Sequence, residues 1–119
     1  MAEHEKIDYL EFPTTDIAKT KDFFSEAFDW SFEDYGEEYT AFFGAGIDGG
    51  FFKSDKIVRA DAGSVLIVFY SLDLNATLNK IMAAGGELVM PIFEFPGGRR
   101  FHFADPNGNE YAVWSDPTK

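Results

Sequence analysis

The stretch that decides the fold is FHFADPNGNEYAVW, residues 101–114. Its middle, DPNGN at 105–109, combines residues that favour tight turns, and strand-like runs lie on both sides of it. We therefore expect a β-hairpin with strands at 99–103 and 110–114. The hairpin alone does not define a fold, because this turn is favourable in any β-rich protein.

Upstream of the hairpin, the second half of the chain has a βαβββ pattern. It begins with the nearly continuous apolar run Ser64–Tyr70, which is typical of a central strand. Asp73 has the character of a helix cap, helical spacing follows it, and Gly85-Gly86 is a favourable helix end. A further strand is expected at 87–93, before the hairpin.

The first half of the chain has the same order of elements. Asp16 precedes a helical pattern as Asp73 does, and the two residues are 57 positions apart, close to half of the chain. This offset indicates an internal repeat. The strands expected in this half lie at 7–12, 30–35, 39–43 and 50–53.

The polar segment 54–63 lacks periodicity, and we interpret it as a linker. At 119 residues the chain fits one domain, which we expect to span 1–119 with a first module at 6–53 and a second at 64–115. The fold class is α+β. A ferredoxin-like βαββαβ sandwich with extra strands is the alternative, because the sequence similarity between the two halves is weak.

Composition narrows the classes of function. The formal net charge of −11 disfavours binding to nucleic acid or to anionic membranes. The chain has no cysteine, which excludes a disulfide, a thiolate nucleophile or a Cys-based metal site. Neither a signal peptide nor a run of about 20 apolar residues is visible, so we expect a cytoplasmic protein. The aromatic share of 18% suits both a core and a small-molecule pocket.

Two motifs then point to a family. The opening IDYLEFPTTD at 7–16 leads into a helix that contains FF at 23–24 and closes with FDW at 28–30. Together with FADPNGN at 103–109, this resembles the vicinal-oxygen-chelate superfamily of glyoxalases, bleomycin resistance proteins and dioxygenases, over nearly the whole chain. The resemblance implies two tandem βαβββ modules that form a curled mixed sheet around a cleft, with the helices on the outer face.

Metal-dependent members of this family place His or Glu ligands on four strands of the cleft. Transferred from the two motifs, these positions fall on Tyr9, Ile67, Ala112 and the segment 49–51. None of them carries a good metal ligand. The resemblance therefore implies a member without a bound metal or other cofactor, and it disfavours the metal-dependent chemistry of glyoxalases and dioxygenases.

Strand alternation extends the cleft face to further residues. Phe101 and Phe103 are expected to pack under a helix, which would turn Arg100 and His102 inward, and Glu94 could also reach the cleft. The candidate ligand-binding residues are Tyr9, Glu11, Ile67, Phe69, Arg100, His102, Ala112 and Trp114.

Glu11 and His102 are the candidate catalytic residues. An imidazole can act as a general base near neutral pH, although a histidine held by a structural hydrogen bond is more common. Glu11 lies among apolar neighbours, and a buried carboxylate is costly without a partner. We therefore expect a direct polar contact between Glu11 and either Arg100 or His102, and such a pair could also be purely structural.

Two more pairs of side chains have both a functional and a structural interpretation. Arg99 and Arg100 follow the flexible Gly97-Gly98, where guanidinium groups could hold a carboxylate or phosphate, although two such arginines are more often solvated. Trp114 and Tyr9 could stack on a ligand or fill the space of the missing metal.

The sequence leaves three functions open. The first is a metal-free protein that binds a small molecule in an aromatic cleft. The second is a lyase, isomerase or dioxygenase-type enzyme that uses Glu11 and His102 as acid and base, or assembles a non-standard metal site from these two and Glu110. The third is an interaction module with an unused cleft. In each case we expect a homodimer, because open sheet edges are usually covered.

Overall fold

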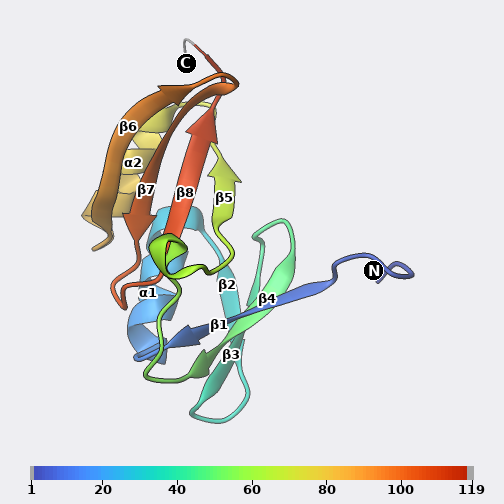
Figure 1. Cartoon of the computed structure of the whole chain (residues 1–119). Coiled ribbons are helices and arrows are strands. Elements are labelled where there is room, and N and C mark those ends of the chain that lie inside the picture. The colour runs from blue at the N-terminus through green and yellow to red at the C-terminus, as the bar shows by residue number, and fades with distance from the viewer. Residues whose placement is uncertain (1, 118–119) are drawn as a thin grey trace.

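The computed structural model describes residues 2–117 and confirms the repeated βαβββ order (Figure 1). The first module is followed by a short 3-10 helix in the linker, and then by the second module. The elements are β1 (Tyr9–Thr14), α1 (Ile17–Phe28), β2 (Ser31–Asp34), β3 (Tyr39–Phe43), β4 (Asp48–Lys53), the 3-10 helix (Ala60–Ala62), β5 (Ile67–Tyr70), α2 (Leu74–Ala83), β6 (Glu87–Phe95), β7 (Gly98–Ala104) and β8 (Glu110–Ser115).

The strands form two separate four-stranded mixed sheets, which we call sheet A and sheet B. Sheet A has the order β1-β4-β3-β2 and sheet B the order β5-β8-β7-β6. In each sheet the first strand runs parallel to the last, and the other pairs are antiparallel. The family resemblance implied a curled mixed sheet around a cleft. The structure has two sheets instead, because β1 and β5 are edge strands with no ladder between them.

The internal repeat extends to individual hydrogen bonds. Asp16 accepts a hydrogen bond from the Lys19 N–H at the start of α1, and Asp73 caps α2 in the same way. Across the first cap, the hydroxyls of Thr14 in β1 and Thr20 in α1 are 2.7 Å apart, and the hydroxyls of Ser71 and Thr77 repeat this distance 57 residues later. The two modules are therefore equivalent residue by residue around their helix starts.

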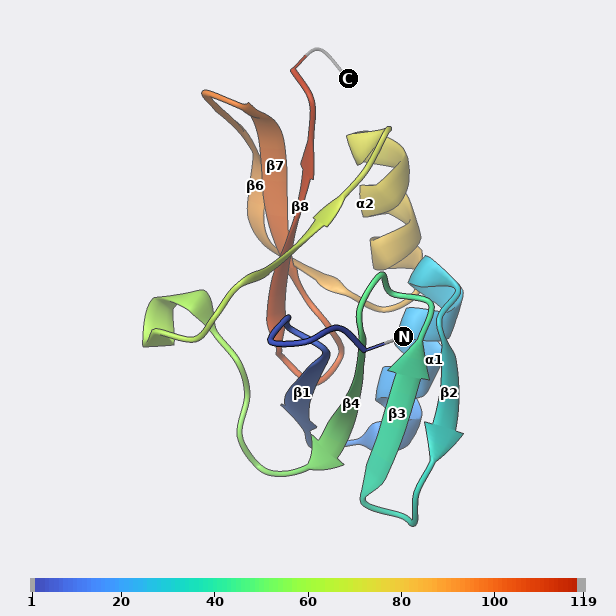
Figure 2. The same ribbon diagram turned by 90° about the vertical axis from the view of Figure 1, so that its right-hand side faces the viewer.

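One aromatic core joins the modules. The Phe24 ring stacks on Trp30 at 4.4 Å within the first module and meets Tyr111 of β8 edge-on at 5.5 Å. Phe23 and Phe28 of the same helix both contact Phe103 of β7. The helices α1 and α2 are neighbours on one side of the molecule (Figure 2). Much of the aromatic content thus serves to hold the two modules together.

The DPNGN turn is a polar junction between the modules. Asn109 is fully buried; its side-chain amide donates to the Pro13 carbonyl at 2.7 Å and accepts from the Val58 N–H at 2.8 Å. It therefore links β1 and the linker to β8. Asp105 is also buried and accepts from the Tyr111 hydroxyl at 2.9 Å; burial raises the pKa of Asp105 to about 6, although its hydrogen bonds oppose this rise.

We expect Asn109→Ala to lower the free energy of unfolding by roughly 2–4 kcal/mol, because two buried backbone groups lose their partners. Urea unfolding followed by circular dichroism measures this change. Asn79→Ala, at an exposed site on α2, is the matched control and should change stability by no more than about 0.5 kcal/mol. Equal stability of the two variants would contradict the role given to Asn109.

Candidate functional site

Each sheet packs one face against the aromatic core, on the same side as α1 and α2. From here on, we call the opposite face of each sheet its outer face. In sheet B the core face carries Phe101, Phe103 and Tyr111, as the sequence predicted for the two phenylalanines. Ile67 and Phe69 belong to this core face as well: Phe69 stacks on Phe28 at 4.5 Å, and both pack against the core. Their expected place on the same face as Ala112 was therefore wrong.

The register of β5 explains this correction. Ile67 is paired with Tyr111, and its neighbour Val68 is paired with Ala112, so Val68 is the residue on the outer face. A shift of one residue along a strand moves every side chain to the other face. The offset of 57 residues was a sequence feature that could have prevented the error, since it makes Leu66 the equivalent of Tyr9.

His102 and Glu110 form a buried pair on the outer face of sheet B. They are 4% and 5% exposed, and the His102 Nδ1 lies 2.8 Å from a Glu110 carboxylate oxygen. The other carboxylate oxygen accepts from the Ala60 N–H at 3.0 Å and lies 3.7 Å from the Arg59 guanidinium. The His102 Nε2 is buried without a hydrogen-bond partner among residues 2–117.

The charge of Glu110 is stabilised by these contacts. Burial by itself would raise the pKa of the Glu110 carboxyl, but the hydrogen bonds with His102 and the Ala60 N–H, together with the charge of Arg59, hold this pKa below its ordinary value of 4.5. The backbone of Glu110 also donates to the Val58 carbonyl at 2.8 Å. These hydrogen bonds hold the linker against His102 and Glu110, and the linker covers both side chains.

Glu11 has a different neighbourhood. It is exposed on sheet A and accepts a hydrogen bond from the Tyr39 hydroxyl at 3.0 Å. The Tyr9 and Tyr39 hydroxyls are 2.5 Å apart, and Tyr9 donates because the Tyr39 proton is directed to Glu11. The pKa of Tyr39 is raised by burial and by these two hydrogen bonds.

The expected contact of Glu11 with Arg100 or His102 is thus a wrong prediction for this chain. Glu11 lies in sheet A and the two basic residues lie in sheet B, and the two sheets share no ladder. Sequence alternation showed that Glu11 and His102 each point away from the apolar positions of its own strand. It could not show that the two outer faces belong to separate sheets.

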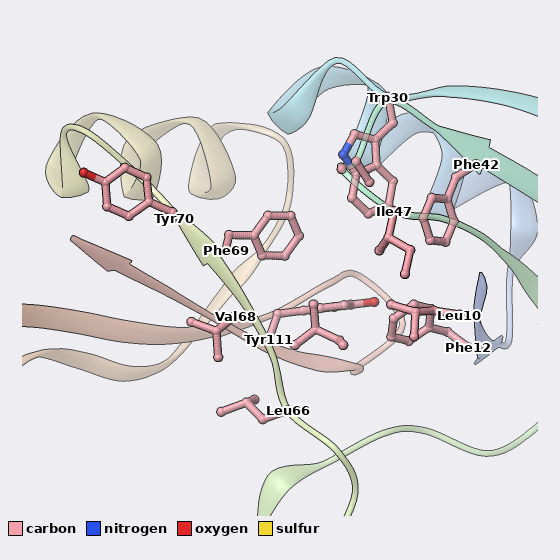
Figure 3. A pocket seen from close by; sticks show the side chains of 13 residues that line it. Leu10, Phe12, Trp30, Phe42, Ile47, Leu66, Val68, Phe69, Tyr70 and Tyr111 are labelled. Carbon is pink, nitrogen blue, oxygen red and sulfur yellow. The ribbon is translucent and has the colours of Figure 1, made fainter. Parts of the chain in front are cut away.

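A cavity of about 610 Å³ lies between the two modules, at the gap between β1 and β5 (Figure 3). Its walls come from the first module's core and from both sides of the edge strand β5. Ile67 and Phe69 are the candidate ligand-binding residues found here. The lining residues are Leu10, Phe12, Trp30, Phe42, Ala45, Gly46, Ile47, Leu66, Ile67, Val68, Phe69, Tyr70 and Tyr111.

Sequence reasoning missed most of this lining. Trp30 and Phe42 stack on each other at 4.6 Å and form one wall, and Ile47 follows them in the loop between β3 and β4. The high aromatic content was the only sequence feature that pointed to such a cavity. The relative placement of the two modules, which creates it, is not encoded in strand alternation.

The other candidate residues are distributed over separate surfaces. Arg100 and Trp114 line a pocket of about 350 Å³ with Val68, on the outer face of sheet B. Tyr9 lines a pocket on sheet A, and Glu11 lines a groove beside the linker. The eight candidates therefore do not form one site.

Within residues 2–117, no group of three or more His, Asp or Glu side chains is placed to hold a metal ion. Glu11 is bonded to Tyr39 in one sheet, whereas His102 and Glu110 pair in the other, so the non-standard site considered from sequence is not assembled. Over the same residues, no helix is long and apolar enough to cross a membrane.

Comparison with known proteins adds a family and a fold. The family model described as "Glyoxalase/Bleomycin resistance protein/Dioxygenase superfamily" matches residues 6–113. The chain superposes on the fosfomycin resistance protein FosX of Listeria monocytogenes with a TM-score of 0.79, at 17% identity over 98% of this chain and 94% of that one. The chain also superposes on a glyoxalase-related enzyme from Fulvimarina pelagi with a TM-score of 0.74, at 18% identity over 94% of this chain and 88% of that one.

A third structure is a glyoxalase/bleomycin resistance protein/dioxygenase family enzyme from Burkholderia phytofirmans PsJN. Its TM-score is 0.76, at 14% identity over 92% of this chain and 99% of that one. At these identities the structures show a shared fold and nothing about activity. Comparison with curated protein sequences finds no match.

Glu110→Gln removes the charge of the Glu110 side chain and keeps its size, so it measures what the charge contributes to stability. A carboxyl with a lowered pKa stabilises the fold above the unfolded-state pKa, and this stability is lost as the pH falls through the folded-state value. We expect wild type to be more stable than Glu110→Gln by about 1–2 kcal/mol at pH 7, and the difference to shrink below pH 4.5.

Urea unfolding between about pH 3 and 7 measures this difference, with Glu26→Gln at an exposed site on α1 as the control. Amide exchange at Ala60 reports on the linker directly and should become faster in Glu110→Gln. A stability difference that stays constant with pH would contradict the electrostatic role of Glu110.

Proposed function

This chain belongs to the glyoxalase/bleomycin resistance protein/dioxygenase superfamily, and we propose that it binds a small, largely apolar molecule in the cavity between its modules without a resident metal ion. The observation that carries the proposal is the cavity itself. Its volume of about 610 Å³ lies within the range of small-molecule sites, roughly 300–1,000 Å³. Aromatic walls with few polar groups are also typical of such sites.

The shape of the cavity favours a flat apolar ligand. Trp30 and Phe42 provide one stacked wall, and Phe69 extends it, with its ring 6.1 Å from Trp30 in a nearly parallel orientation. The Tyr111 hydroxyl is bonded to Asp105, so it is already satisfied. A ring that enters the cavity would therefore meet apolar faces and would not break an existing hydrogen bond.

The residues at the family's metal-ligand positions do not fit a metal, which supports the metal-free part of the proposal. With the register of the two sheets and the offset of 57 residues, the equivalent positions are Tyr9 on β1, Leu66 directly before β5, Gly50 on β4 and Ala112 on β8. Leu66, Gly50 and Ala112 have no donor atom in their side chains. A Cβ at Gly50 would lie 2.1 Å from the Tyr39 hydroxyl, so this position has no room for a longer side chain.

The enzymatic alternative has less support. A lyase, isomerase or dioxygenase-type reaction at Glu11 and His102 would need both groups near one substrate. In this chain they lie in different sheets with different partners, Tyr39 and Glu110. We therefore place ligand binding ahead of catalysis.

We also propose that the protein is a homodimer. The edge strands β1 and β5 each lack a second neighbour, and exposed edges are usually paired or covered. Large apolar side chains are exposed on both outer faces, among them Phe43 and Phe52 on sheet A and Tyr70 on sheet B. Burial of such a surface favours association.

The dimer can be tested by light scattering at micromolar concentration and moderate salt. We expect twice the chain mass of 13.4 kDa. Low salt should weaken the dimer, because two chains of net charge −11 repel each other. A monomer mass at moderate salt would contradict the proposal.

The cavity can be tested with the neutral dye N-phenyl-1-naphthylamine. The chain has two tryptophans, so labelling with 5-fluorotryptophan provides two ¹⁹F resonances, which Trp30→Phe and Trp114→Phe assign. We expect saturable binding that shifts the Trp30 resonance. Ala45→Phe, which fills the cavity, should weaken binding about tenfold or more, whereas Ala18→Phe on the exposed face of α1 should not.

Binding should be unchanged after dialysis against a chelator, because the proposed site has no metal. A chelator-sensitive affinity would contradict the metal-free part of the proposal. No shift of Trp30, or equal affinities for Ala45→Phe and wild type, would contradict the choice of the cavity.

A further inference from the structure

Arg100 is a half-buried cation that has no carboxylate partner in the described part of the chain. Its guanidinium lies 5.5 Å from the centre of the Phe93 ring and 5.9 Å from that of Phe95. Among residues 2–117 no carboxylate pairs with it, and its Nε is buried without a hydrogen-bond partner. The chain has 21 acidic and 10 basic residues, so carboxylates are in excess over the cations that could pair with them. An arginine without a carboxylate partner is unusual in such a chain.

Packing on the aromatic rings explains only part of this arrangement. Cation–π contact with Phe93 and Phe95 accounts for the position of the guanidinium. It leaves the buried Nε–H without an acceptor, and an unsatisfied buried donor is costly. The fork of a guanidinium matches the two oxygens of a carboxylate or a phosphate.

A pocket opens directly at this guanidinium. It has a volume of about 350 Å³ and is lined by Val68, Phe95, Gly97, Arg100 and Trp114. Trp114 is the partner of Arg100 in the β7–β8 ladder, and Tyr70 packs edge-on against it at 5.0 Å.

Asp116 lies at the end of this face, but it accepts a hydrogen bond from the Tyr70 hydroxyl and makes no ion pair with Arg100. The pocket thus combines one unpaired cation with apolar and aromatic walls. It lies on the outer face of sheet B, whereas most rings of the inter-module cavity, such as Trp30, Phe42 and Tyr111, belong to the core. Val68 lines both.

We propose that this pocket is a subsite for the oxyanion of an aromatic acid, with a carboxylate or phosphate on Arg100 and the ring against Val68 and Trp114. The proposal rests on the proposed small-molecule function and adds the ligand's charge to it. The net charge of −11 opposes the approach of any anion, but this repulsion is screened beyond about 8 Å at physiological salt. Recognition would therefore depend on the local guanidinium.

The test compares three probes with the same ring system: 1-naphthoate, 1-naphthyl phosphate and the neutral 1-naphthalenemethanol. The 5-fluorotryptophan resonances separate the two sites, because Trp114 lines the Arg100 pocket and Trp30 lines the cavity. We expect at least one of the two anions to shift the Trp114 resonance and to bind more tightly than the alcohol. The anion that binds more tightly shows whether the pocket prefers a carboxylate or a phosphate.

Arg100→Met keeps the length and the apolar stem of the side chain and removes its charge. We expect it to weaken binding of the preferred anion about tenfold and to leave binding of 1-naphthalenemethanol unchanged. Arg100→Lys keeps the positive charge but lacks the forked guanidinium. It should weaken anion binding less than Arg100→Met does, and it replaces Arg100→Met in the test if that variant does not fold. Lys19→Met, exposed on α1, removes one positive charge elsewhere and should have no effect.

The outcomes separate this inference from the proposed function. The subsite proposal would be overturned if the anions bound Arg100→Met as tightly as wild type. It would also be overturned if they bound Arg100→Met and Lys19→Met with equal affinity. Shifts of Trp30 alone would overturn the subsite and leave the cavity proposal standing. No response of either resonance to the three probes or to the neutral dye would overturn both.

Discussion

The contact of Tyr111 with the rings of the first module is the interaction on which the rest of the structure depends. Its ring lies 5.8 Å from Phe12 of β1 and 5.5 Å from Phe24 of α1, and stacks on Phe103 of its own sheet at 5.2 Å. Its hydroxyl is held by the buried Asp105 in the DPNGN turn. Because no ladder joins the two sheets, this aromatic packing and the polar junction around Asn109 align the modules.

The cavity is a consequence of the same arrangement. The aromatic core is continuous under α1, but the edge strands β1 and β5 do not pair, and the space between them is not filled. Many residues of its walls, such as Phe12 and Phe69, belong to the core or pack against it. A ligand in this space would complete a core that the chain leaves open, which is why we place the apolar part of the site there.

The two outer faces differ in charge. On sheet A a chain of hydroxyls leads from Tyr9 through Tyr39 to the carboxylate of Glu11. On sheet B the carboxylate of Glu110 is hydrogen-bonded to His102 and lies 3.7 Å from the Arg59 guanidinium under the linker, whereas Arg100 has no carboxylate partner among residues 2–117. The buried pair therefore holds the linker against sheet B, and it lies apart from Arg100, whose partner in the ladder is Trp114.

The sequence by itself determined what depends on neighbours along the chain. The caps at Asp16 and Asp73, the DPNGN turn and the repeated βαβββ order follow from local hydrogen bonds and residue periodicity, and all of them are found in the structure. The tertiary structure alone decided which faces meet. Ile67 and Phe69 point to the core because one residue of register decides the face, and Glu11 is bonded to Tyr39 because the two sheets are separate. Register and module packing are set by contacts between residues far apart in the chain, and alternation within a single strand contains no information about them.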